Sequence, residues 1–177
     1  MFLDLIFHDI PNTVANAVRV AADLGVWMLN VHISGGSAMM KSAKDAILSY
    51  GDCRPILMGV TVLTSISNAD LSEIGIDNDL REQVVKLAKL AYQSGLDGVV
   101  CSAEEAKLLR NSMPADFILV TPGIRREQDA AGDQKRVITP SQAIRSGSDY
   151  LVVGRPITQA VSPTAALAAF NSEIASV

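Results

Sequence analysis

The feature that most constrains the fold of this chain is a regular alternation of short apolar runs with helical patterns. Six such runs lie at 2–7, 26–33, 55–63, 97–101, 117–124 and 150–155. They are rich in Val, Ile and Leu and hardly alternate with polar residues, which is typical of parallel strands covered on both faces. Six βα units in succession therefore predict an α/β protein whose parallel strands are joined by right-handed crossovers.

The segments between the runs carry helix start and stop signals. Ser102 with Glu105, and Thr139 with Gln142, have the spacing of capping boxes. A helix over 80–94 is predicted from its apolar positions at a period of 3.6 residues. A first helix, opened by Asn12 or Thr13 and closed by Gly25, shows the same period at Val14, Ala17, Val18, Ala21 and Leu24.

Two architectures accommodate such a pattern: an open doubly wound sheet and a TIM-type barrel. A barrel needs eight βα units and typically ~250 residues, so a chain of 177 residues with six units would be an incomplete barrel. The stretch 126–135 has no periodic pattern and is predicted to be a mobile loop. We find no linker, and we expect one domain over 1–177.

Composition excludes several classes of partner and site. The net charge is −4, so the basic footprint of a nucleic-acid-binding protein is absent. No apolar run approaches the ~20 residues that span a bilayer, and no signal segment opens the chain. Cys53 and Cys101 lack metal-like spacing. We therefore expect a cytoplasmic protein without a disulfide or zinc site, in which Cys101 is buried.

Polar residues follow several of the predicted strands. Ligands bind at the carboxyl ends of the strands in both architectures. The polar residues at these ends are Asp4 and Asp9 in the first unit, Asn30 and His32 in the second, and Thr61, Thr64 and Ser65 in the third. His32 is expected to be a hydrogen-bonded wall residue rather than a catalyst.

The last two strand ends have the composition of an anion site. Gly123 and Gly154 allow backbone N–H groups to approach a ligand closely, and Arg125 and Arg155 supply planar guanidinium donors. The loops after the last strands of barrels often hold a phosphate. The alternative is that both arginines are solvated loop cations and both glycines belong to ordinary turns.

The first run raises a question about charge. Because strand side chains alternate between faces, Phe2, Asp4 and Ile6 share one side, and Leu3, Leu5 and Phe7 share the other. A carboxylate on the inward side of a buried strand is costly unless a cation or a hydrogen-bond donor meets it. Asp4 therefore calls for such a partner, and Ile6 cannot supply one.

Seven blocks of sequence together resemble one known family. They read FLDLIFHDIPNT, LGVWMLNVHISGG, VTVLTS, GLDGVVCSAEEA, LVTPGIR, GDQKR and YLVVGRPIT, and they resemble the bacterial-type orotidine 5′-phosphate decarboxylases over essentially the whole chain. The resemblance implies a (β/α)₈ barrel that works as a homodimer and converts orotidine monophosphate (OMP) to UMP and CO₂. It also implies that no metal and no organic cofactor is used.

The family signature in the first run is D-x-K-x-x-D. By this resemblance Asp4 lies beside the substrate carboxylate, and position 6 would carry the lysine that protonates the pyrimidine carbon as CO₂ departs. Asp9 and Thr13 would reach into the active site of the partner subunit.

The remaining motifs place the nucleotide. By resemblance, Thr64 lies against the pyrimidine and Gln134 bridges base and phosphate. Arg155 holds the phosphate together with the Gly154 backbone, and Gly123 and Arg125 lie at the same rim.

The sequence departs from the family pattern twice. Position 6 is Ile, and the chain starts at what the family counts as its third strand, so the first two βα units are lacking. We therefore expect decarboxylation by this chain to be strongly impaired, and the unpaired outer strands to favour self-association.

Two alternatives remain open. One is a non-catalytic barrel scaffold that retains at most a phosphate or nucleotide site. The other is a sibling decarboxylase acting on a sugar phosphate acid, although that chemistry also uses the missing lysine and generally a magnesium ion.

Overall fold

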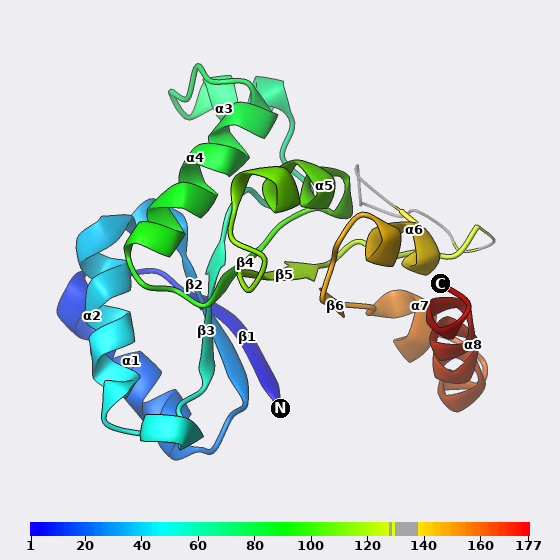
Figure 1. Ribbon diagram of the computed structural model, residues 1–177, viewed down its shortest axis with the longest axis horizontal. Helices are drawn as coiled ribbons and strands as arrows, with labels where there is room; N and C mark the ends of the chain where they lie inside the picture. Colours follow the sequence, from blue (N-terminus) through cyan, green and yellow to red (C-terminus); the bar gives the residue numbers. More distant parts are fainter. Residues whose placement is uncertain (128, 130–137) are drawn as a thin grey trace. The chain divides into compact units, whose positions relative to one another are not determined.

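The computed structural model describes residues 1–127, 129 and 138–177, which form two compact units. The first unit comprises Met1–Thr61 and Glu82–Val100, and the second comprises Val62–Arg81 and Cys101–Val177 (Figure 1). The assignment of 1–177 to one domain stays a prediction.

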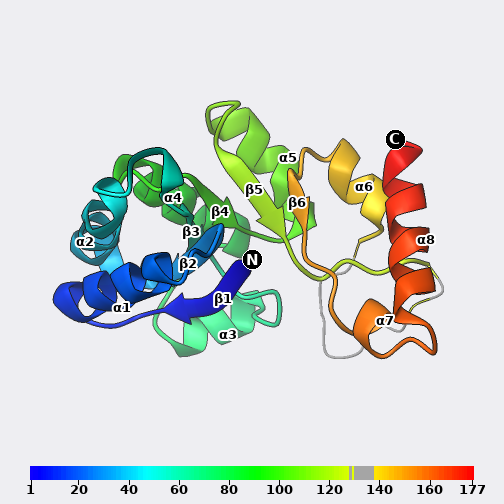
Figure 2. The same ribbon diagram turned by 90° about the horizontal axis from the view of Figure 1, so that it is seen from below.

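The first unit is built on four parallel strands in the order β1-β2-β3-β4. Its elements are β1 (Phe2–Phe7), α1 (Pro11–Asp23), β2 (Met28–His32), a 3₁₀ turn (Ile33–Gly35), α2 (Gly36–Leu48), a 3₁₀ turn (Gly51–Cys53), β3 (Ile56–Val60), most of α4 (Leu80–Gln93) and β4 (Gly98–Val100). Helices α1 and α2 pack against each other beside the strands (Figures 1 and 2). The predicted parallel arrangement is confirmed, because β1 pairs with β2, β2 with β3, and β3 with β4, each in parallel.

Burial explains why the central strands form where they do. All of β2 except its last residue, and all of β3 except its first, are buried, as expected for strands covered on both faces. β1 differs, since Asp4 and Leu5 at its centre are exposed. The expectation that all six runs are covered on both faces is therefore wrong for β1, which pairs only with β2 among the described residues.

The second unit contains two parallel strands and five helices among the described residues. They are α3 (Asn68–Glu73), α5 (Ala103–Ser112), β5 (Ile118–Thr121), α6 (Pro140–Arg145), β6 (Tyr150–Leu151), α7 (Arg155–Thr158) and α8 (Pro163–Ala175). Ile124, Ala143 and Phe170 form a core with Ala103. Both predicted capping boxes, at Ser102 and Thr139, are present.

A carboxylate in front of a strand joins two neighbouring strands in each unit. Asp97, directly before β4, accepts hydrogen bonds from the Leu57 backbone N–H of β3 at 2.8 Å and from Arg54 and Lys44, both at 2.8 Å. In the second unit Asp149, directly before β6, accepts from the Leu119 N–H of β5 at 2.7 Å. Each carboxylate thereby holds the amino end of its own strand to the preceding strand: β4 to β3, and β6 to β5.

Arginine reinforces the second of these joints. Arg110 on α5 forms an ion pair with Asp149 and donates to the Phe117 carbonyl at 2.7 Å and to the Gly147 carbonyl at 2.8 Å. Each carboxylate is the last residue of a Ser-Gly-x-Asp sequence that follows a helix. The same local sequence therefore builds the same strand-to-strand contact twice.

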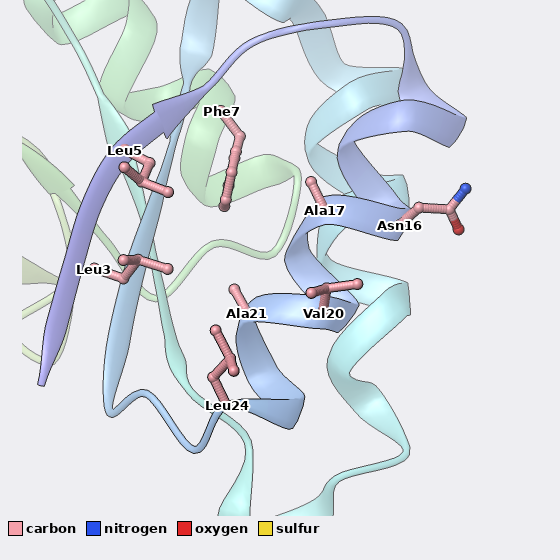
Figure 3. A pocket seen from close by; sticks show the side chains of 8 residues that line it. All are labelled: Leu3, Leu5, Phe7, Asn16, Ala17, Val20, Ala21 and Leu24. Atoms are coloured by element: carbon pink, nitrogen blue, oxygen red, sulfur yellow. The ribbon is translucent and has the colours of Figure 1, made fainter.

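Several other sequence expectations can be compared with the structure. Cys101 is buried, as predicted, and Cys53 is exposed. Leu24 shares the apolar period of α1 but is 69% exposed, because it lies one residue beyond the helix, beside the edge of β1 with which no other described strand pairs (Figure 3). Most of the loop predicted at 126–135 lies outside the described residues. Among those that are described, no helix is long and apolar enough to cross a membrane.

Candidate functional site

Asn30 organises the part of the candidate site that lies in the first unit. It is fully buried in β2, its Nδ2 donates to Asp4 Oδ1 at 2.5 Å, and its Oδ1 accepts from the Ile6 backbone N–H at 2.8 Å. One amide thus binds both the carboxylate and the backbone of the D-x-I-x-x-D segment. The sequence placed Asn30 at a strand end near the site but predicted no role for it. An amide within an apolar strand was the feature that could have revealed the role, because a buried amide needs hydrogen-bond partners.

The backbone at Ile6 is unusual for a β-branched residue. Its φ is 54°, and the pairing of β1 with β2 shifts register between Leu3 and Phe7. An isoleucine in the left-handed region is a genuine outlier, because its branched side chain crowds the backbone there. The hydrogen bond from Ile6 N–H to Asn30 therefore helps to hold a bulge that sets the direction of residue 6.

Asp4 and Asp9 are both exposed, which alters the argument about buried charge. Since the Asp4 side chain meets solvent as well as Asn30, it needs no cation in order to fold, and the expected cost of an inward carboxylate is avoided. The ion pairs among the described residues do not include Asp4. Asp9 Oδ1 accepts from the Ile10 N–H at 2.6 Å, and Thr13 is exposed in the first turn of α1.

Two histidines stack where β1 and β2 end. The rings of His8 and His32 lie 5.2 Å apart between centroids with 18° between their planes. His32 Nδ1 accepts from the Ser34 N–H at 3.2 Å, which confirms its expected hydrogen-bonded role. Burial, and then the nearby His8, lower the pKa of His32, so its neutral form is favoured.

The residues predicted to bind phosphate lie in the second unit. Gly123 is buried with a φ of 79°, a conformation that favours glycine. Arg125 is only 8% exposed and donates to the Ile124 carbonyl at 2.7 Å. Arg155 is exposed at the start of α7, and the space beside Gly154 where a Cβ would stand is open.

These positions differ in what they can do chemically. An exposed guanidinium next to an open backbone can meet a phosphate, so Arg155 and Gly154 suit that role. Arg125 also helps to hold its loop, because its side chain donates to the Ile124 carbonyl and its backbone N–H donates to the Ile138 carbonyl at 3.1 Å. Thr64 is half-buried, and Gln134 lies outside the described residues.

The described residues contain no cluster of three or more His, Cys, Asp or Glu side chains that could hold a metal ion. In the first unit, Asp4, Asp9, Asn30 and the two histidines are polar groups near the ends of β1 and β2, and position 6 of the signature among them is Ile. In the second unit, the exposed guanidinium of Arg155 can bind an anionic ligand.

Comparison with known proteins identifies the family. A model described as the orotidine 5′-phosphate decarboxylase / HUMPS family matches residues 1–170. The chain belongs to this family. The orotidine 5′-phosphate decarboxylase of Vibrio atlanticus is 58% identical over 175 residues, covering 99% of this chain and 76% of the relative. That of Shewanella sediminis is 60% identical over 174 residues, covering 98% and 74%.

Solved structures agree with this assignment. Orotidine 5′-phosphate decarboxylase from Lactobacillus acidophilus superimposes with a TM-score of 0.86 at 46% identity, over 98% of this chain and 74% of that one. An uncharacterized conserved protein from Geobacillus kaustophilus gives 0.83 at 39% identity, over 98% and 75%. The Pyrococcus horikoshii decarboxylase, at 22% identity and a TM-score of 0.74, shows the shared fold.

These findings confirm the expected family and the α/β fold of the TIM-barrel type, with six parallel strands among the described residues. The family name is that of a carboxy-lyase of pyrimidine biosynthesis. The chain spans about three quarters of the length of the relatives it matches.

Proposed function

We propose that this chain binds a pyrimidine nucleoside monophosphate, OMP or UMP, and decarboxylates OMP far more slowly than relatives that carry lysine in the D-x-K-x-x-D signature. The observation that carries the proposal is Ile6. It occupies the lysine position on a backbone held by Asn30, with Asp4 bound to the same amide.

The chemistry of the reaction explains why this one side chain matters. Loss of CO₂ leaves negative charge on the ring carbon, and a fixed ammonium both stabilises that charge and delivers the proton. Isoleucine does neither, so water must supply the proton. Loss of the proton donor alone costs roughly 10²–10⁴ in rate, and loss of the ammonium charge adds to it.

Binding is less affected than catalysis under this proposal. Arg155 with the Gly154 backbone would hold the phosphate, which is remote from the reacting carbon. Gly123 and Arg125, whose side chain also donates to the Ile124 carbonyl, would form the rim of the phosphate site. Thr64 and Gln134 would contact the base. The energy of phosphate binding positions the ring whether or not a proton donor is present.

A homodimer completes the proposed site. Asp9 and Thr13, both exposed in the first unit, would reach into the active site of the partner subunit, as the family resemblance implies. Their solvent exposure is compatible with that role.

Calorimetric titration with UMP, paired with a spectrophotometric assay of OMP decarboxylation, tests the proposal. We expect UMP binding that Arg155→Ala abolishes, together with turnover that is barely detectable. Ile6→Lys should raise turnover by at least the factor given above, whereas the uncharged long-chain control Ile6→Met should not. Wild-type turnover equal to that of Ile6→Lys would refute the proposal.

A non-catalytic scaffold is the second candidate. It is favoured by one observation: Asn30 satisfies Asp4 and the Ile6 N–H without any ligand, so this segment needs no substrate to be ordered. Absence of UMP binding at millimolar nucleotide, in both the wild type and Ile6→Lys, would establish this second function.

A further inference from the structure

A second arginine directly follows the arginine at the rim of the proposed phosphate site. Arg126 and Asp129 form an ion pair in which Arg126 Nη2 lies 3.0 Å from Asp129 Oδ1 and Arg126 Nε lies 3.2 Å from Asp129 Oδ2. The guanidinium thus meets both carboxylate oxygens, which is a strong geometry for such a pair. The two side chains are 17% and 12% exposed, so water and salt screen the pair less than they screen a fully exposed one.

Backbone hydrogen bonds hold the Asp129 carboxylate beside Arg125 as well. The Arg126 N–H donates to Asp129 Oδ2 at 2.9 Å, and the Asp129 N–H donates to the Arg126 carbonyl at 2.9 Å. The first of these N–H groups belongs to the peptide that joins Arg125 to Arg126. The negative charge of Asp129 therefore lies next to Arg125, and its backbone contacts remain when the side chain of Arg126 is changed.

An aromatic ring fixes the position of the Arg126 guanidinium. Arg126 Cζ lies 4.7 Å from the centre of the Phe170 ring, and a cation over the face of an aromatic ring is attracted to it. Phe170 is 1% exposed on α8 and packs in the core of the second unit with Ile124. The core thus holds both Ile124, which directly precedes Arg125, and the ring that receives Arg126.

Four charged side chains act on one another in this part of the second unit. The side-chain hydrogen bonds from Arg126 lower the pKa of Asp129 despite its partial burial, and the charge of Arg125 lowers it further. The hydrogen bond to Asp129 raises the pKa of Arg126, and the charge of Glu173 raises it further. Arg125 and Arg126 therefore balance Asp129 and Glu173, and loss of either arginine would leave a net negative charge.

We propose that Arg126 is a positioning residue for the phosphate site: it neutralises Asp129, so that the positive charge of Arg125 acts on the nucleotide phosphate rather than on this carboxylate. Arg126 does so without touching the nucleotide, because both of its contacts run to Asp129 and Phe170. The inference rests on the proposed function, which places Arg125 at the rim of the phosphate site.

A carboxylate beside an anion site acts against the ligand in two ways. It repels the phosphate by like charge, and it competes for the guanidinium donors that the phosphate uses. Both effects grow where water is partly excluded, and Arg125 is only 8% exposed. A second arginine that binds both oxygens of the carboxylate reduces the repulsion and the competition together.

Calorimetric titration of the full chain and its variants with UMP tests the inference. Arg126→Gln should raise the dissociation constant roughly tenfold, because Asp129 is then no longer neutralised. Arg126→Lys should stay within about threefold of the wild type, because it keeps the charge and loses only the planar fork. Arg145→Gln is the matched control, since Arg145 is exposed in the last turn of α6; it removes the same charge and should leave the dissociation constant unchanged.

A second substitution separates this electrostatic role from a purely structural one. Asp129→Asn removes the carboxylate charge, so UMP should bind as tightly as to the wild type or more tightly. Adding Asp129→Asn to Arg126→Gln should return the dissociation constant to within about threefold of the wild type. If the pair served only to hold the loop, each substitution would weaken binding and the double variant would bind no better than Arg126→Gln. Circular dichroism of each variant confirms that it is folded.

Three results would overturn the inference alone. These are an Arg126→Gln variant that binds UMP as the wild type does, an Arg126→Lys variant that binds as weakly as Arg126→Gln, and a double variant whose binding is not restored. In each case the proposed function stands as long as the wild type binds UMP and Arg155→Ala abolishes that binding. A wild-type chain that binds no UMP at millimolar nucleotide would instead refute the inference and the proposed function together.

Discussion

Asp97→Asn should destabilise the first unit far more than a surface carboxylate substitution does. The Asp97 carboxylate accepts from Arg54 Nη1 and Nη2 at 2.8 and 2.9 Å, from Lys44 at 2.8 Å and from the Leu57 N–H at 2.8 Å. An asparagine keeps the shape but loses the charge, and its NH₂ group has no acceptor among these cations and N–H donors.

The structure sets the size of the effect. The side chains of Asp97, Lys44 and Arg54 are 18%, 14% and 33% exposed, so the network is neither fully exposed nor fully buried. Exposed ion pairs contribute about 0.2–1 kcal/mol, and breaking a buried pair costs about 3–5 kcal/mol. We therefore expect a loss of about 2–4 kcal/mol in the free energy of unfolding.

Acid should reveal the same network. Burial by itself would raise the pKa of Asp97, but the hydrogen bonds from Arg54, Leu57 and Lys44 outweigh it and lower the pKa below its ordinary 3.8. A depressed folded pKa gives stability that is present above the ordinary pKa and lost as the pH falls through the folded value. Asp97→Asn should therefore flatten the acid limb of the stability profile.

Urea unfolding followed by tryptophan fluorescence measures this. Trp27 is the single tryptophan, and its carbonyl accepts from the Ile56 N–H at 2.9 Å, so it reports on the first unit. The control is Asp45→Asn, an exposed carboxylate on α2. A loss below about 1 kcal/mol, or one equal to that of the control, would show that the network contributes no more than a surface pair.

Three further predictions concern backbone strain and pH. Gly147→Ala should cost about 2 kcal/mol in thermal or urea unfolding, because φ there is 98° and a Cβ would lie 2.6 Å from Arg110 Cγ. Ile6→Gly should change the free energy of unfolding by less than about 1 kcal/mol, since relief of the left-handed strain at 54° is offset by glycine's entropy and the lost side chain; a larger loss would show that the Ile6 side chain is needed for packing. His32, whose pKa is lowered by burial and by His8, should stabilise the neutral-pH form, so urea midpoints should fall as the pH drops below the ordinary 6.5, and His32→Gln should remove that fall.

The parallel strands and several helix ends could be predicted because their causes are local, although α1 begins at Pro11 with Ile10 as its N-cap rather than at Asn12 or Thr13. β1 coincides with the run at 2–7, and both capping boxes lie where the Ser/Thr-x-x-Glu/Gln spacing put them. The other runs are longer than their strands, since each run continues past the point where ladder pairing stops. For example, the run at 55–63 contains β3, which ends at Val60.

The candidate site was harder to predict because its geometry depends on contacts distant in sequence. Asn30 lies 26 residues from Asp4, and only the register of β1 with β2 brings the two together. The positive φ of Ile6 runs against the preference of a β-branched residue and could not be predicted from its type. Leu24 was misjudged because helical period identifies an apolar face but not whether a neighbour covers it.

The carboxylates before β4 and β6 have a consequence for how this fold tolerates change. Asp97 and Asp149 join strands at their amino ends, whereas Asp9, Arg125 and Arg155 follow the carboxyl ends of β1, β5 and β6. The interactions that maintain the scaffold and the side chains that would perform chemistry are thus separated along each strand. A reactive side chain at a strand's carboxyl end can therefore be replaced by an inert one while the protein stays folded. The reverse replacement changes one residue and requires no change in the backbone.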